Sequence, residues 1–311
     1  PWTDITNEGL GLKSAYLGGT KGSHIVLDNA ELLEACDGRE IFFENSDGRI
    51  VLMYPILGRV LLGTTDIPID DPNDAVCTEE EVDYFFDLAS HVFPTIALDR
   101  SQIVFRYSGV RPLPVAGDLS PGVVSRDYRI VQDTIEGGQK ILSLIGGKWT
   151  TFRALGEHLA DEALALLRVS RHQSTIGLAI GGGKGFPVTA AERAQWVQDN
   201  KGSLSAERAD QLLTRYGTVA LSVMEDIAQF GDKPLTHTPH YSVGEIMSLA
   251  LREHVVSLSD LIFRRTLLGF VGEISLQSVS EMGSVISPIL EWSEEELAQQ
   301  VSLVPVERPQ R

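Results

Sequence analysis

The periodicity of the sequence changes near residue 170, and this change constrains the fold more than any other feature. Before it, short apolar runs bounded by turn residues are typical of strands; they cover residues 23–27, 40–44, 49–54, 59–64, 103–107, 129–131 and 140–145. After residue 188, apolar residues recur every three or four positions, which indicates helices at 189–199, 205–215, 217–230, 242–253, 258–268 and 293–301. Since 311 residues exceed one ordinary core, we expect an α+β region followed by an all-α domain.

Two local signals refine the first region. The turn at residues 45–48 ends in Asp47-Gly48 and predicts a β-hairpin between its flanking strands, within an antiparallel or mixed sheet. Thr78 followed by Glu81 predicts a helix that begins with a capping box. We therefore expect a sheet that packs against at least one helix.

The stretch 171–188 contains five glycines, four of them in the run Gly181-Gly182-Gly183-Lys184-Gly185, and predicts a flexible linker. We therefore divide the chain into residues 1–170, the linker 171–188 and a helical domain at 189–311. The first residues, beginning Pro1-Trp2, favour a fragment of a longer protein.

Composition excludes several classes of function. The formal net charge of −17 argues against nucleic acid as a partner, because such binding needs a basic surface. Cys36 and Cys77 form no Cys-x-x-Cys pair, and no histidine pair has metal-ligand spacing, so we expect neither a disulfide framework nor a metal site. No apolar run approaches the roughly 20 residues that span a bilayer.

A glycine pair followed by a lysine, Gly146-Gly147-Lys148, lies between a predicted strand and a predicted helix. It fails the phosphate-loop pattern, because Leu142 stands where a glycine is needed and Trp149 where Ser or Thr is needed. A helix N-terminus beside a lysine and a bare backbone suits a group that is or becomes anionic. The alternative is a tight turn with an exposed lysine.

Three further side chains are candidates for chemistry. Arg111 and Arg126 lie in or beside loops marked by glycine or serine, and the guanidinium fork suits phosphate or carboxylate. His24 begins a strand and could act as a general base. Surface salt bridges for the arginines, and a hydrogen-bonded strand residue for the histidine, remain alternatives.

Together, these stretches resemble the FAD-dependent glycerol-3-phosphate dehydrogenases of the aerobic, membrane-associated type. The resemblance follows family order across nearly the whole chain, at residues 21–26, 62–66, 107–113, 125–128, 145–153 and 260–266. The family's flavin-binding βαβ unit, with its Gly-x-Gly-x-x-Gly turn, is missing here. The resemblance therefore implies the C-terminal part of such an enzyme: most of a substrate-binding sheet, the last strand and helix of the flavin domain, and an all-α C-terminal domain.

The resemblance assigns cofactor contacts to Gly146, Gly147, Lys148 and Thr150, which family members place at the pyrimidine edge of the flavin. Lys148 would stabilise the negative charge that develops on the reduced ring. Because the dinucleotide-binding turn is missing, the 311 residues alone are expected to retain no FAD and to be inactive.

The resemblance also assigns the substrate, sn-glycerol 3-phosphate. Arg111 and Arg126 would hold its phosphate, and His24 would accept the proton of its C2 hydroxyl as hydride leaves. Two arginines favour this phosphate over the carboxylate of an amine oxidase substrate.

Membrane quinone is the electron acceptor that the resemblance implies. The protein would then be cytoplasmic, peripheral on the inner face of the cytoplasmic membrane, and a possible homodimer. An oxidase that passes electrons to oxygen, and a non-catalytic anion-binding or scaffold module, remain as alternatives.

Overall fold

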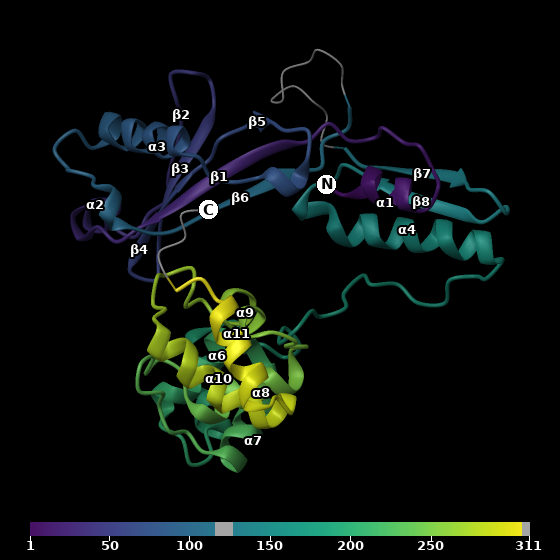
Figure 1. Ribbon diagram of the computed structural model, residues 1–311. Coiled ribbons are helices and arrows are strands. Elements are labelled where there is room, and N and C mark those ends of the chain that lie inside the picture. Colours follow the sequence, from purple (N-terminus) through teal and green to yellow (C-terminus); the bar gives the residue numbers. More distant parts are fainter. Residues whose placement is uncertain (116–126, 307–311) are drawn as a thin grey trace. The chain divides into compact units, whose positions relative to one another are not determined.

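The computed structural model describes residues 1–115 and 127–306, which form two compact units (Figure 1). Unit 1 comprises Pro1–Ile176, and unit 2 begins at Gly177. The division falls inside the stretch 171–188. No helix in the described residues is long and apolar enough to cross a membrane.

Unit 1 combines two antiparallel sheets with helices. Its elements are α1 (Thr3–Gly9), β1 (Thr20–Leu27), α2 (Ala30–Cys36), β2 (Ile41–Glu44), β3 (Ile50–Ile56), β4 (Arg59–Gly63), β5 (Ile67–Pro68), η1 (Pro72–Asp74), α3 (Glu79–Val92), η2 (Arg100–Gln102), β6 (Ile103–Arg111), β7 (Arg129–Thr134), β8 (Lys140–Ile145), η4 (Trp149–Thr151) and α4 (Phe152–Leu167). All seven predicted strands are present. Sequence analysis did not predict α1, α2 or β5.

The larger sheet has six strands. β2, β3, β4, β1 and β5 are neighbours in that order, and β6 pairs with the other edge of β1. Every pairing between described strands is antiparallel, so the sheet is not mixed. Figure 1 shows β1 and β6 as a long adjacent pair, with α3 beside β2 and β3.

One face of this sheet is covered by α2 and α3. Ile25, Leu62 and Met53 from three adjacent strands pack with Phe85 and Leu88 of α3. The predicted capping box is confirmed, since the Thr78 side chain accepts from the backbone of Glu81 and the Glu81 side chain accepts from the backbone of Thr78. Packing on this face stabilises the sheet. The candidate site lies on the opposite face.

The smaller sheet is the β7–β8 hairpin, and α4 packs against β8. Asn7 of α1 bonds to Ser143 of β8, with its Nδ2 atom 3.0 Å from the serine Oγ atom. β8 leads through Gly146, Gly147 and Lys148 into η4 and α4, so the predicted order of strand, glycine turn and helix is confirmed.

The described regular elements of unit 2 are helices joined by loops. Its elements are α5 (Ala190–Asn200), α6 (Ala206–Tyr216), η5 (Gly217–Val219), α7 (Ala220–Phe230), α8 (Val243–Arg252), α9 (Leu258–Asp260), η6 (Leu261–Arg265), α10 (Leu276–Leu290) and α11 (Glu294–Leu303). The predicted single helix over 258–268 is wrong in detail: α9 is one turn, η6 is a π-helix, and residues 266–268 lie outside both.

Sequence analysis missed α10, the longest helix of unit 2. Its interior contains several serines and Gly283, which favour the helix weakly, and Pro288 near its end. A Cβ atom on Gly283 would stand 2.7 Å from Leu297 of α11. Packing against α11 therefore explains the glycine and overrides its low helix propensity.

The glycine-rich run 181–185, predicted to be flexible, makes hydrogen bonds to Thr218, although only Gly182 of the run is buried. Thr218 donates to the Gly182 carbonyl from its backbone nitrogen (2.8 Å) and also from its hydroxyl (3.0 Å). The same hydroxyl lies 2.8 Å from the Lys184 carbonyl. These bonds fix the run against the turn between α6 and α7.

Candidate active site on the open face of the sheet

The face of the larger sheet turned away from α3 carries the predicted histidine and arginine. His24 on β1 is paired in register with Gly63 of β4 on one side and with Tyr107 of β6 on the other. Two residues earlier on β1, Gly22 is paired with Gly109. Because side chains alternate along a strand, these positions share one face.

His24 is held between its neighbouring strands. Its ring stacks on that of Tyr107, with centroids 5.0 Å apart and planes at 7°. It also lies over Gly63, where a Cβ atom would stand 2.5 Å from Nε2. A side chain at position 63 would therefore displace the imidazole.

Burial, and to a smaller extent the positive charge of Arg111, lowers the pKa of His24 from 6.5 to about 4. The imidazole is therefore neutral near pH 7. Its Nδ1 atom is buried and has no hydrogen-bond partner among the described residues. A neutral ring with an unused nitrogen can accept or donate a proton.

The Arg111 guanidinium lies over Gly22. A Cβ atom on Gly22 would stand 2.7 Å from Arg111 Cζ. Arg111 Nη1 donates to an oxygen of Asp66 at 3.0 Å, and Nη2 donates to the Thr64 hydroxyl at 3.1 Å. These contacts hold the planar fork flat against β1.

Beside the guanidinium the face is open. Gly109 is exposed, and a Cβ atom there would meet no described atom within 4 Å. Gly22 and Gly63 thus make room for the side chains of Arg111 and His24, while the position above Gly109 is empty. A ligand on this face would contact Arg111 and Tyr107.

The glycine–lysine turn has a different construction. Gly146 and Gly147 have φ values of +75° and +106°, which few other residues adopt. A Cβ atom on Gly146 would stand 2.8 Å from the Asp127 carbonyl oxygen, and one on Gly147 would stand 2.9 Å from Leu155. The chain's own backbone and packing therefore require these glycines, whether or not a ligand approaches.

Lys148, Trp149 and Thr150 point away from the interior. All three are exposed, and Trp149 is 88% exposed. No side chain caps the first turn of α4, but η4 precedes it, and the Phe152 backbone N–H already donates to the Trp149 carbonyl. Trp149 stacks on Phe152, with ring centroids 5.8 Å apart.

The end of β6 and the glycine turn are neighbours in unit 1. Pro114 Cγ is 3.6 Å from the position that a Cβ atom on Gly146 would take. A hollow of about 570 Å³ is lined by Pro112, which follows Arg111, by Gly146, and by residues of α1 and β8. The segments that follow Arg111 and precede Lys148 thus border one hollow, but neither of these two residues is among those that line it. Arg126 lies outside the described residues.

Sequence reasoning did not single out Thr64, Asp66 or Tyr107, although each contacts a predicted site residue. Only the register of β6 on β1 reveals Tyr107 as the neighbour of His24. Only the path of the chain after β4 reveals the two partners of Arg111.

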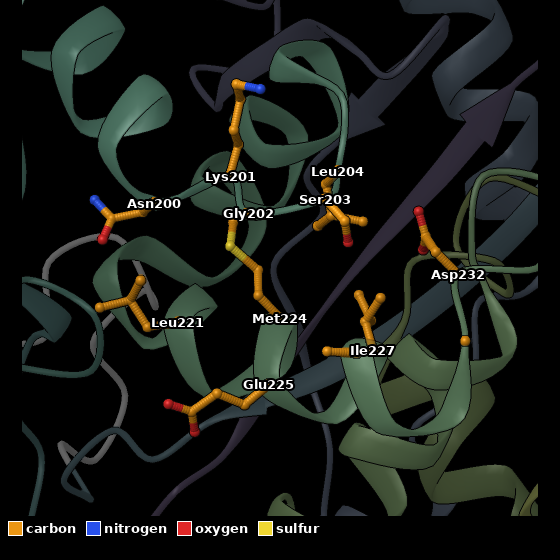
Figure 2. A pocket seen from close by; sticks show the side chains of 12 residues that line it. Asn200, Lys201, Gly202, Ser203, Leu204, Leu221, Met224, Glu225, Ile227 and Asp232 are labelled. Carbon is orange, nitrogen blue, oxygen red and sulfur yellow. The ribbon is translucent and has the colours of Figure 1, made fainter.

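A second hollow, of about 540 Å³, lies in unit 2 between the end of α5 and α7. Figure 2 shows Met224 and Ile227 of α7 on its wall, with the charged ends of Lys201, Glu225 and Asp232 pointing in different directions. Since these charged groups do not converge, we do not treat this hollow as a catalytic site.

Sequence comparison identifies relatives along most of the chain. The profile of the family described as FAD dependent oxidoreductase matches residues 1–161, and that of the C-terminal domain of alpha-glycerophosphate oxidase matches residues 173–297. A glycerol-3-phosphate dehydrogenase of Pseudomonas tolaasii is 30% identical over 86% of this chain and 52% of its own length. One of Synechocystis is 28% identical over 92% of this chain and 52% of its own length.

A solved structure shares the fold. The X-ray structure of glycerol-3-phosphate dehydrogenase from Bacillus halodurans, complexed with FAD, superposes with a TM-score of 0.77 at 22% identity. The superposition covers 97% of this chain and 59% of that one. This chain spans about half the length of the two bacterial relatives, and 34% of a mitochondrial glycerol-3-phosphate dehydrogenase from Homo sapiens.

The first profile matches more than half of the 311 residues. Its family is one of enzymes, and FAD is their cofactor, as sequence analysis predicted. On the match over residues 1–161, from the N-terminal residue into α4, the chain therefore belongs to the FAD-dependent oxidoreductase family.

Proposed function

We propose that this chain is the substrate-binding and C-terminal part of a flavoenzyme that oxidises sn-glycerol 3-phosphate to dihydroxyacetone phosphate. The observation that carries the proposal is the pairing of an arginine with a neutral histidine on an open sheet face. An arginine fork suits a phosphate ester, and a neutral imidazole suits an alcohol that must lose a proton. The names of the relatives support this choice of substrate.

Arg111, with Arg126, binds the phosphate in this proposal. A dianion on Arg111 cancels the positive charge that helps to depress the pKa of His24. Substrate binding would thus make His24 a stronger base at the moment when it accepts the proton of the C2 hydroxyl. When bound, FAD takes the hydride from C2.

Lys148, the backbone of Gly146 and Gly147, and the Thr150 hydroxyl are the residues that would hold the flavin edge. The exposed lysine fits a ring that gains negative charge, because a nearby cation favours an anion. The two glycines turn the backbone, and Lys148 supplies the positive charge.

A separate flavin-binding unit completes the enzyme in this proposal. The sequence contains no Gly-x-Gly-x-x-Gly turn, and no described strand other than β7 pairs with β8. β8 and α4 would then be the last strand and helix of the flavin domain. Residues 1–170 form the substrate-binding region, 171–188 the connection and 189–311 the C-terminal domain.

Membrane quinone as acceptor, peripheral attachment at the cytoplasmic face and a homodimer belong to the same proposal. One observation favours a second candidate, an oxidase that passes electrons to oxygen: the profile that matches residues 173–297 is named for alpha-glycerophosphate oxidase. If the flavin-loaded protein forms hydrogen peroxide in proportion to the substrate that it oxidises, this result would favour the oxidase.

The test compares the 311-residue chain with the protein that carries the flavin-binding unit. With FAD, sn-glycerol 3-phosphate and a quinone-like dye, the chain alone should retain no flavin and reduce no dye. In the longer protein, Arg111→Ala should lower kcat/KM by an amount equivalent to about 2–5 kcal/mol, because a buried charged hydrogen bond is lost.

Arg39→Ala is the matched control, since Arg39 is an exposed arginine of unit 1 whose side chain keeps 80% of its accessible surface. It should leave kcat/KM unchanged. Wild-type kcat/KM in Arg111→Ala would exclude Arg111 from substrate binding, and stoichiometric flavin on the chain alone would contradict the need for a second unit.

A further inference from the structure

A buried ion pair lies directly behind the candidate site. Lys21 of β1 and Glu81 of α3 meet with Nζ and Oε2 2.5 Å apart, and the two residues are 8% and 2% exposed. Lys21 points to the face of the sheet opposite Gly22 and also donates to the Val76 carbonyl at 2.6 Å. Burying such a pair costs desolvation, so stability alone is a weak reason for it.

The pair continues into a hydrogen-bonded chain. The other oxygen of Glu81 accepts from the Thr65 hydroxyl at 2.6 Å, and that hydroxyl accepts from the Ser23 backbone nitrogen at 2.9 Å. Burial alone would raise the pKa of Glu81, but the hydrogen bonds that it accepts, from Lys21 and Thr65 first, hold it below its ordinary value. Glu81 is therefore an ionised acceptor that fixes Thr65.

Thr65 lies between the two residues that hold Arg111. Its own side chain reaches back to Glu81, while Thr64 and Asp66 bond to the guanidinium. The segment lies between β4 and β5, outside any helix or strand, and its side chains contact both Glu81 and Arg111. A shift of Thr65 would therefore move both partners of Arg111 together.

We propose that Lys21, Glu81 and Thr65 are positioning residues that fix the Arg111 guanidinium for a phosphate monoester. They act through Thr64 and Asp66 and do not touch the substrate themselves. The inference rests on the proposed function for the identity of the ligand, but the mechanical link rests only on the contacts. An arginine fork binds a phosphate well only when its plane is held in place.

The experiment uses Thr65→Val, which removes the hydroxyl and keeps the shape, and Thr65→Ser, which keeps the hydroxyl. Leu88→Ala is the control for stability, because Leu88 is buried on α3 in the same core and takes no part in the network. Glu81→Gln is a further variant that weakens the ion pair with Lys21. If Glu81→Gln does not fold, the test rests on Thr65→Val alone. Two readouts are the order of the Arg111 Nε–H bond by NMR and the KM for sn-glycerol 3-phosphate in the flavin-loaded protein.

Thr65→Val should loosen Arg111 and raise KM about tenfold while kcat changes less than about twofold. Thr65→Ser should restore both, and Leu88→Ala should change neither. The inference is overturned if Arg111 stays as ordered in Thr65→Val as in the parent, or if Leu88→Ala loosens it equally. If Thr65→Val loosens Arg111 but the parent protein does not oxidise sn-glycerol 3-phosphate, the positioning role stands and the proposed substrate is wrong.

Discussion

Arginines bind carboxylates in both units, but the two arrangements differ in whether the arginine also borders space that a ligand could occupy. In unit 2, Glu245 is fully buried and accepts from Arg208, Arg215 and the Tyr216 hydroxyl, each at 2.7 Å. In unit 1, Arg111 is half-buried, bonds to one carboxylate, and borders the empty space over Gly109.

This difference distinguishes charged groups that stabilise the packing of helices from charged groups that can bind a ligand. The three side chains that donate to Glu245 come from α6, and Glu245 itself lies in α8, so the cluster joins two helices. Burial, together with the charge of Glu245, also raises the pKa of Tyr216, so this hydroxyl stays protonated and keeps donating. On the sheet, the contacts of Arg111 fix its orientation and leave its outer side accessible.

The variant with the largest expected effect on stability tests the role of Glu245. Glu245→Ala removes the carboxylate and leaves two arginines close together, so it should lower the free energy of unfolding of unit 2 by about 3–5 kcal/mol. Hydrogen exchange of the amides in α6 and α8 should accelerate, while exchange in β1 and β6 stays unchanged. Glu295→Ala, at an exposed position of α11, should change stability by less than about 0.5 kcal/mol.

Stability equal to that of the parent protein would mean that the Glu245 cluster does not hold the helices. Faster exchange in β1 would mean that the two units do not respond independently.

A smaller effect is expected from glycines on the open face. Gly63→Ala places a Cβ atom against the His24 ring and should cost about 1–3 kcal/mol, as other overpacked positions do. Gly109→Ala enters open space and should be neutral within about 0.5 kcal/mol. Thermal unfolding measures both, and the NMR shifts of His24 should move in the first variant alone. Equal losses of stability in the two variants would contradict the view that Gly63 makes room for His24 while Gly109 borders open space.

The smallest effect is a shift in one titration. By NMR, the pKa of His24 should be about 4, and inorganic phosphate should raise this pKa by neutralising Arg111. Because the folded pKa is depressed, the unfolded chain binds a proton between pH 6.5 and pH 4 that the folded chain does not. His24 therefore contributes stability above pH 6.5, and this contribution is lost as the pH falls towards 4. A pKa near 6.5, or no response to phosphate, would show that His24 is neither buried nor coupled to Arg111.

Much of the fold could be predicted because its strands and most helices carry their own periodicity. The hairpin at residues 45–48 and the capping box at Thr78 need only neighbouring residues, and both are confirmed. α10 could not be predicted, since contact with α11 stabilises a segment of low helix propensity. The short helices α1 and α2, of seven residues each, give little periodicity to detect.

The site was harder to predict, because it depends on register. His24 and Arg111 could be chosen as candidates by residue type, but their shared face follows from the pairing of β1 with β6. A slip of one residue would send one of them to the side of α3. Thr64 and Asp66 lie in the stretch 62–66 that carries the family resemblance, but their role as partners of Arg111 appears only where the chain after β4 passes the guanidinium.

The contact between Gly182 and Gly217 limits which sequences this fold can accept. A Cβ atom on Gly182 would stand 2.2 Å from the Tyr216 carbonyl oxygen, and one on Gly217 would stand 2.5 Å from the Gly182 carbonyl oxygen. In a saturation mutagenesis library, neither position should accept another residue, and a second change at its partner should not rescue the first, because backbone meets backbone. Gly181, with an ordinary φ and no described atom near its Cβ position, should accept most residues. A run that looks like low-complexity sequence therefore mixes one of the least replaceable positions of unit 2 with one of the most replaceable.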